Sequence, residues 1–471
     1  MSATNSPPVA TLPDKGPMIN DWRPEDSQFW AAKGKAIASR NLWISIPALL
    51  LAFSVWMVWS TVIVRLNGIG FTFTTDQLFW LAALPGLSGA TFRIFYSFMV
   101  PIFGGRRWTA LSTASLLLPA LWMGFAVQNP ETPYSVFVII ALLCGFGGGN
   151  FASSMSNISF FYPKAQQGTA LGLNAGLGNL GVSVMQFSVP LVIGAGIFGA
   201  VGGSPQELVG GGQLWLQNAG YIWVPFIALV TIAAWFGMND LASANASFSE
   251  QAVIFTRKHN WLMCWLYLAT FGSFIGFAAG FPLLIKTQFP GIDPLKFAFL
   301  GPLVGALVRP VGGWVADKMG GARVTLWNYV VMIAAVFGVL EFLPHDGGAG
   351  NFYGFLAMFM LLFITTGIGN GSTFRMIPVI FRTLHERLTV NASAQEKELA
   401  MKGAGKESAA VLGFSSAIAA YGAFFIPKSF GTSMALTGGP QMALYAFMVF
   451  YASCIVVTWW WYSRKNAEMP C

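Results

Sequence analysis

The stretch Arg93-Ile-Phe-Tyr-Ser-Phe-Met-Val-Pro-Ile-Phe-Gly-Gly-Arg-Arg-Trp-Thr109 returns 216 residues later in the chain. The second copy reads Arg309-Pro-Val-Gly-Gly-Trp-Val-Ala-Asp-Lys-Met-Gly-Gly-Ala-Arg-Val-Thr325, and it keeps the leading arginine, the Gly-Gly pair and the final threonine. Such a repeat indicates two related halves. Glycine-rich segments can match by chance, but a shared arginine within an apolar segment argues against chance because arginine is rare there.

Two more pairs of segments support the duplication. The first matches Gly147, Gly149 and Asn150 with Gly367, Gly369 and Asn370. The second matches Gly168, Gly176 and Pro190 with Gly405, Gly413 and Pro427, and it sets Asn179 against Ser416. Because the offset between the copies grows along the chain, the second half carries extra length. We place that length in the charged segment Arg382–Lys406.

The composition indicates that lipid surrounds most of the chain. Hydrophobic residues make up 55% of the sequence and charged residues 9%, with a mean hydropathy of +0.61. A helix needs about 20 apolar residues to cross a bilayer, and lipid favours helices because they satisfy their own backbone hydrogen bonds. Such stretches occur at residues 42–64, 78–103, 108–127, 134–162, 166–195, 220–238, 260–285, 294–316, 324–343, 353–379, 407–432 and 440–463. The sequence therefore predicts an all-α membrane protein with about twelve transmembrane helices in two pseudo-symmetric six-helix halves.

The repeat and the spans divide the chain into five parts. These are an N-terminal tail (1–41), a first half (42–238), a linker (239–260), a second half (261–463) and a C-terminal tail (464–471). The first tail is polar and proline-rich and lacks the apolar core of a cleaved secretory signal. We expect it to be disordered, apart from a short helix near Ser27–Ala38.

Lysine and arginine are retained mainly on the cytoplasmic side of a membrane, so their positions predict the orientation. With both termini and the linker in the cytoplasm, the basic residues on the far side are only Arg65, Lys286, Lys296 and Lys428. The net charge of +8 is then mostly a topology signal. The chain has no dense basic cluster, which argues against a nucleic-acid partner and leaves the lipid bilayer as its surroundings.

Arg93 and Arg309 carry the predicted chemistry. An arginine at the centre of a transmembrane helix costs about 2.5–3.5 kcal/mol, so it usually faces a cavity and has a partner. None of the 18 acidic residues falls near the middle of a predicted helix. The cargo must then supply the negative charge, and the flat guanidinium fork suits a small flat oxyanion. The alternative is that both arginines only brace the fold through helix carbonyls. Arg375 sits nearer the cytoplasmic end, and we expect a structural or gating role for it.

The missing acids also bear on the mechanism. A proton-coupled carrier normally needs a carboxylate or histidine in its pathway, and the three histidines lie in loops or at helix boundaries. Two positive charges in an empty binding site should oppose the conformational change that moves the site from one side of the membrane to the other. This favours obligatory exchange of one anion for another. Proton symport and a passive anion channel remain open alternatives. A membrane haem enzyme is excluded because the helices lack facing histidines, and the four cysteines have no ligand-like spacing, so we expect no metal and no cofactor.

Gly168, Gly172 and Gly176 follow one another at four-residue spacing on one helix face. This spacing predicts that a neighbouring backbone comes close, and it marks packing more often than ligand contact. Asn179 lies one turn further on, and Gly413 precedes its counterpart Ser416. Aromatic residues that could wall a site nearby are Tyr267, Phe271 and Phe151, although each alone is more often a core or lipid-facing residue.

Three stretches together resemble the nitrate/nitrite porter family, the NarK type, of the major facilitator superfamily. They are Leu-Ser-Gly-Ala-Thr-Phe-Arg93 with Tyr96 to Trp108, then Gly168-Thr-Ala-Leu-Gly-Leu-Asn-Ala-Gly-Leu-Gly-Asn179, and Gly413-Phe-Ser-Ser-Ala-Ile-Ala-Ala-Tyr-Gly-Ala-Phe-Phe-Ile-Pro427. The resemblance covers the chain after residue 40. It implies an antiporter that takes up nitrate and exports nitrite across a bacterial inner membrane, in support of nitrate respiration. We expect the protein to be a monomer.

By matching position, the resemblance implies a role for each candidate residue. Arg93 and Arg309 would clamp the anion, Asn179 and Tyr267 would hydrogen-bond it, Phe151 and Phe271 would sandwich it, and Ser416 would add a contact. The family also contains proton-linked importers, and the acid-free core favours the exchangers. The superfamily's loop motif has its acid in the second copy, at Asp317, but not before Arg107. An acid–base latch at the first loop is therefore not expected.

Overall fold

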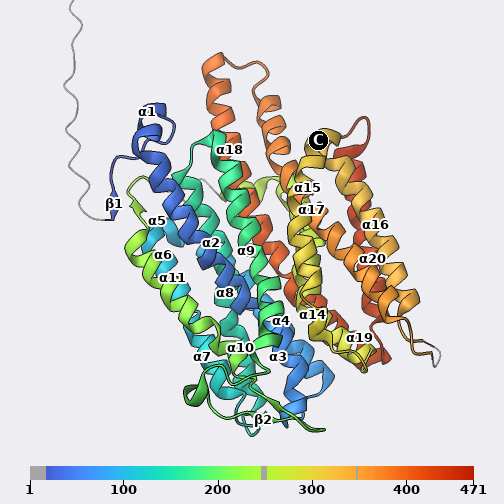
Figure 1. Cartoon of the computed structure of the whole chain (residues 1–471). Coiled ribbons are helices and arrows are strands. Elements are labelled where there is room, and N and C mark those ends of the chain that lie inside the picture. Colours follow the sequence, from blue (N-terminus) through green and yellow to red (C-terminus); the bar gives the residue numbers. More distant parts are fainter. Residues whose placement is uncertain (1–16, 245–251, 346–347) are drawn as a thin grey trace, which may run out of the picture.

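The computed structural model describes residues 17–244, 252–345 and 348–471. It consists of two helical bundles side by side, the first built by the N-terminal half and the second by the C-terminal half (Figure 1). Within these residues, twelve helical segments are long and apolar enough to cross a membrane. The predicted fold class is therefore confirmed.

The first half contains helices from residue 27 to residue 237. Their bounds are α1 (Ser27–Phe29), η1 (Trp30–Gly34), α2 (Lys35–Met57), α3 (Trp59–Leu66), η2 (Asn67–Ile69), α4 (Thr75–Tyr96), α5 (Met99–Phe103), α6 (Gly105–Ala114), α7 (Leu117–Ala126), α8 (Tyr134–Phe161), α9 (Lys164–Val192), η3 (Gly199–Gly202), α10 (Asn218–Tyr221) and α11 (Trp223–Gly237). A Thr74–Gln77 capping box starts α4, the helix that carries Arg93.

The second half repeats this arrangement. Its helices are η4 (Val253–Thr256), α13 (Lys258–Tyr267), η5 (Leu268–Gly272), α14 (Ser273–Gln288), η6 (Pro294–Lys296), α15 (Leu300–Met319), α16 (Gly321–Phe342), α17 (Phe352–Leu388), α18 (Ala394–Ala420), α19 (Gly422–Thr437), α20 (Gln441–Thr458) and η7 (Trp459–Ser463). The turn η5 is a π-helix within the seventh span, and such turns occur frequently at functional sites.

Large apolar side chains remain exposed along the spanning helices. Leu229, Phe236 and Val449 keep 64%, 80% and 72% of their surface uncovered. Soluble proteins rarely expose so many large apolar groups on their helices, whereas lipid covers them at no cost. This surface agrees with a multi-pass membrane protein.

The described N-terminal segment, from residue 17, and the C-terminus lie at the same end of the molecule (Figure 1). There the strand β1 (Met18–Ile19) pairs in parallel with β4 (Asp240–Leu241) of the linker, and the indole of Trp22 donates to the Phe160 carbonyl. From Met18 onward the N-terminal segment is thus folded, unlike the disordered tail that its composition predicts. The part of the expected disorder before residue 17 lies outside the described residues.

Asp240 supplies the acid that the first loop lacks. It is buried, its Oδ1 accepts the backbone N–H of Arg106 at 2.8 Å, and its Oδ2 accepts Arg106 Nε at 3.2 Å. Arg107 lies 3.8 Å from the same oxygen. The latch at this loop therefore exists, contrary to expectation, because the linker provides the missing carboxylate. In the second copy Arg375 pairs with Asp317.

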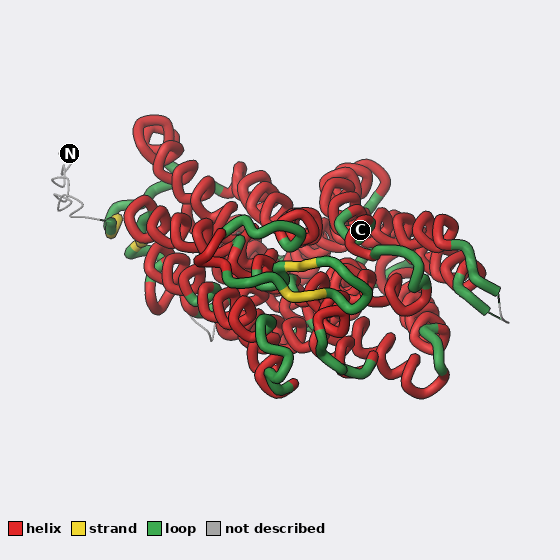
Figure 2. The backbone as a smooth tube through the Cα atoms, turned by 60° about the horizontal axis from the view of Figure 1, so that its bottom comes forward, coloured by secondary structure: helices red, strands yellow, loops and turns green. Residues whose placement is uncertain are grey.

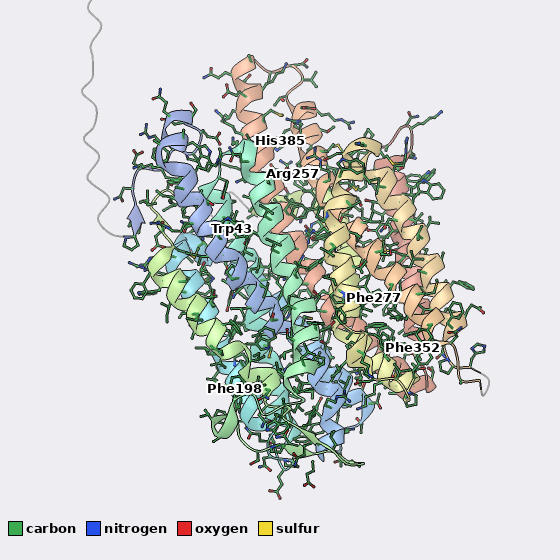
Figure 3. All side chains as sticks on the ribbon, viewed as in Figure 1. Trp43, Phe198, Arg257, Phe277, Phe352 and His385 are labelled. Atoms are coloured by element: carbon green, nitrogen blue, oxygen red, sulfur yellow. The ribbon has the colours of Figure 1, made fainter. Side chains whose placement is uncertain are left out.

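The charged segment 382–406 is a helical hairpin that extends α17 and α18 beyond the bundle (Figure 1). At its base Glu407 accepts hydrogen bonds from Arg257 at 2.8 and 2.9 Å and lies 3.1 Å from His385 Nε2. The hydrogen bond to Glu407 raises the pKa of Arg257. Figure 3 shows Arg257 and His385 close together at this end, and Phe198 at the opposite end. Glu407 lies within α18 and is paired.

The opposite end holds the halves together. The strands β2 (Gln206–Glu207) and β3 (Gln213–Leu214) pair antiparallel across the loops there (Figure 2). Two ion pairs join the halves, Arg65 with Asp293 and Asp76 with Lys428, each at 2.8 Å. Further along α4, its packing on α19 is so tight that a Cβ at Gly86 would clash with the backbone of α19. The halves therefore meet firmly at the end away from the chain termini.

Candidate functional site

Arg93 is buried between the halves, with only 1% of its surface exposed. Its Nε donates to the Gly148 carbonyl of α8 at 2.9 Å, within its own half. Its Nη1 donates to the Ser416 carbonyl of α18 at 3.1 Å, in the other half. The third nitrogen, Nη2, is buried and has no hydrogen-bond partner among the described residues. One donor group of a fixed cation is thus left for a ligand.

Three aromatic rings surround this guanidinium. The Arg93 Cζ lies 4.7 Å from the ring centroid of Phe151, 5.2 Å from that of Trp56 and 5.6 Å from that of Phe271. A ring face attracts a cation, and the attraction is stronger where water is excluded. The rings therefore hold the charge in place without neutralising it. Sequence reasoning missed Trp56 because it lies in an apolar span where no residue stands out.

Arg309 occupies the corresponding place in the second half and is partly buried. Its Nη2 donates to the Tyr267 hydroxyl at 3.2 Å, and its Cζ lies 5.3 Å from the ring centroid of Phe374. Its Nη1 is buried and unpartnered within the described part of the chain. Neither Arg309 nor Arg93 has a carboxylate as an ion-pair partner among those residues. Phe374 is a second neighbour that carried no signal in the sequence.

The rings of the predicted sandwich connect the two arginines. Phe151 and Phe271 come from different halves, with ring centroids 6.4 Å apart and planes at 29°. Phe271 in turn stacks on Tyr267 at 5.6 Å. An inserted flat anion needs about 7 Å between rings, from two contacts of about 3.5 Å. The rings would therefore part slightly to admit it.

Asn179 and Ser416 contribute differently. Asn179 is buried on α9, and its Oδ1 has no hydrogen-bond partner among the described residues. The hydrogen bonds of the two arginines go to other residues. The Ser416 hydroxyl donates to the Gly413 carbonyl of its own helix at 2.8 Å, while its backbone carbonyl accepts from Arg93. Contacts therefore link Arg93, Phe151, Phe271, Tyr267, Arg309 and the Ser416 backbone into one group.

The signature glycines face open space. A Cβ added at Gly168, Gly172, Gly176 or Gly413 would meet no atom of the described residues within 4 Å. Gly181, on the same helix α9, shows the opposite, since a Cβ there would clash with the Leu50 carbonyl. The close backbone approach that the glycine spacing predicts is thus absent from this conformation.

Comparisons with known proteins give the family. A family model described as the Major Facilitator Superfamily matches residues 44–393. The nitrate/nitrite transporter NarU of Salmonella typhimurium is 58% identical over 96% of this chain and 97% of its own length. The probable nitrate/nitrite antiporter NarK2 of Thermus thermophilus is 43% identical over 97% of this chain and 99% of its own length. The chain belongs to the nitrate/nitrite porter family of the major facilitator superfamily.

The fold of this porter is also similar to solved structures. It resembles the crystal structure of a D-xylose-proton symporter with a TM-score of 0.64, over 90% of this chain and 97% of that one, at 13% identity. At that identity the likeness shows the fold alone. The family resemblance read from the three signature stretches is confirmed, and the porter is a membrane transporter rather than an enzyme.

Proposed function

We propose that this porter exchanges nitrate for nitrite across a bacterial inner membrane, with both termini in the cytoplasm. The observation that carries the proposal is the pair of guanidinium groups, each with a buried N–H group that has no partner among the described residues. A small anion would satisfy both donors and supply the missing negative charge. The printed names of the relatives support nitrate and nitrite as those anions.

The proposed binding site uses both halves. Arg93 Nη2 and Arg309 Nη1 would bind the anion's oxygens, Tyr267 would hydrogen-bond it beside Arg309, and Phe151 and Phe271 would enclose its faces. Asn179 would donate a hydrogen bond to the anion from its side-chain NH2 group once the helices adjust. Ser416 would act through its backbone, which already holds Arg93. Because these residues come from one chain, we propose that the monomer is sufficient and that no cofactor or metal takes part.

The same residues support exchange over one-way transport. Without an anion, two positive charges share a site of low dielectric and repel each other, so bringing the halves together there is unfavourable. A bound anion cancels part of that repulsion and lets the site move between the two sides. The halves meet at the end away from the termini. Because we place the termini in the cytoplasm, we interpret this conformation as closed to the outside and open to the cytoplasm. Nitrite would leave by the same path that nitrate used.

Reconstituted vesicles test the proposal. Purified porter in vesicles loaded with nitrite should take up external nitrate rapidly, and vesicles loaded with a non-transported anion should take up little. A pH-sensitive dye in nitrite-free vesicles reports the main alternative, since proton symport would acidify the lumen as nitrate enters. Uptake that needs no internal anion and leaves the internal pH unchanged would instead indicate a passive channel, and would refute exchange.

A further inference from the structure

Trp56 packs against the Arg93 guanidinium, with its ring centroid 5.2 Å from Arg93 Cζ. It is the penultimate residue of α2, and its side chain is fully buried. We propose that Trp56 is a positioning residue that holds the Arg93 guanidinium in the plane from which Nη2 points into the anion site. This inference deepens the proposed function and rests on it, because it assigns a determinant of anion affinity outside the binding site itself.

The indole is fixed by three helices. Its Nε1 donates to the Pro85 carbonyl of α4 at 2.6 Å. Glycines form the slot around it: a Cβ at Gly89 of α4 would clash with the indole, and a Cβ at Gly148 of α8 would lie 2.7 Å from it. The position of the ring therefore sets how α2, α4 and α8 meet.

The same contacts determine the position of Arg93. Gly148, which lies against the indole, is also the residue whose carbonyl accepts Arg93 Nε. Two turns before Arg93 on α4, Pro85 receives the indole hydrogen bond. Loss of the ring would therefore shift both the helix that carries Arg93 and the carbonyl that orients it, and the free Nη2 would turn away from the anion.

The ring also acts on the charge. Trp56 lies 5.2 Å from Arg93 Cζ, and tryptophan is the strongest cation–π partner among aromatic residues. Arg93 needs such support because it is buried and has no acid, whereas Arg309 is less buried and donates to Tyr267. We therefore expect the effect of Trp56 to be specific to the Arg93 side of the site.

Three variants separate positioning from packing. Trp56→Leu removes the ring, and Trp56→Phe keeps a ring without the indole donor. Trp59→Leu is the matched control: Trp59 is one turn further along, fully buried, and packs on Phe137 at 5.8 Å rather than on Arg93. Both leucine variants should lose thermal stability to a similar degree, since each removes a large buried ring.

The decisive readout is nitrate affinity. We expect Trp56→Leu to raise the Kd and the KM for nitrate by about 10-fold or more, from the loss of a desolvated cation–π contact and of the aligned donor. Trp59→Leu should leave both near the wild-type values, and Trp56→Phe should restore most of the affinity. Equal nitrate affinities in Trp56→Leu and Trp59→Leu would overturn the inference about Trp56. Nitrate exchange by the wild-type protein would still support the proposed function in that case.

A structure of Trp56→Leu gives a test that does not depend on transport. Compared with the wild type, we expect Arg93 in this variant to lack its hydrogen bond to Gly148 or to Ser416. We also expect its Nη2 to point in a different direction. An unchanged Arg93 would refute the positioning role. If the wild-type protein exchanged no nitrate at all, the proposed function would fall, and this structural comparison would still decide whether Trp56 orients Arg93.

Discussion

Arg93 divides its donors between protein and cargo, and this division depends on the shape of the side chain. Two of its nitrogens bind carbonyls from opposite halves, and the third remains free. A lysine ammonium has the same charge, but it is a single point that cannot reach two carbonyls and an anion in one plane. Geometry as well as charge should therefore matter at this position.

Replacing Arg93 by lysine should abolish most exchange. The variant loses a charge-assisted hydrogen bond to the anion, worth about 1.5–3 kcal/mol, which corresponds to roughly 10- to 150-fold in affinity. Nitrate counterflow in vesicles measures the effect. Arg107→Lys, at an exposed arginine outside the site, is the control and should transport normally. Wild-type rates from Arg93→Lys would contradict the role of the guanidinium fork.

At the scale of the helix, α9 presents its signature glycines to open space in this conformation. Their small size therefore has no packing purpose here, and we propose that it serves the opposite conformation, in which another helix closes over this face. Alanine tests this idea well because it adds one carbon and favours the helix.

Gly172→Ala should leave the folded protein as stable as before, or more so by up to about 1 kcal/mol, because alanine is the better helix former. Exchange should nevertheless slow, since the added methyl group obstructs the closed face. Gly181→Ala on the same helix is the control and should lower the melting temperature, at a cost of about 1–3 kcal/mol from overpacking. If Gly172→Ala exchanged at the wild-type rate, the glycine face would have no part in the conformational change.

A second element, the linker strand β4, ties the N-terminal segment to the first loop through Asp240. Replacing Asp240 by asparagine should destabilise the protein by about 3 kcal/mol, because it leaves the buried Arg106 without its counter-charge. Thermal unfolding in detergent measures this loss. Asp21→Asn, in an exposed ion pair with Arg23, should change stability by less than about 1 kcal/mol. Similar melting temperatures for both variants would show that the latch does not stabilise the fold.

At the scale of the molecule, the two ion pairs between the halves should favour the conformation seen here. Asp293→Asn should shift the population toward the alternative conformation by up to about 5-fold, since a half-exposed pair contributes up to about 1 kcal/mol. Labelling of a cysteine placed between the halves at this end reports the opening. The exchanged pair Arg65→Asp with Asp293→Arg should restore the original labelling rate. An unchanged labelling rate in Asp293→Asn would exclude a gating role.

The parts of this architecture differ in how well the sequence predicts them. The twelve spans and Arg93 with Arg309 follow from the chain because long apolar runs and membrane-embedded arginines are rare and conspicuous. Trp56 could not be found, since its role comes from the Gly89 and Gly148 slot that only packing creates. Asp240 was equally hidden, because its partner lies 134 residues away. The open glycine face depends on the conformation, which composition does not encode.

The hydrogen bond from Arg93 to residue 416 ends on the peptide backbone. Any amino acid at that position offers the same oxygen, so substitutions at residue 416 during evolution would not break this hydrogen bond between the halves. For the same reason the bond would produce no covariation signal between positions 93 and 416. Only an amide-to-ester replacement of the backbone, which weakens the oxygen as an acceptor, would isolate its contribution.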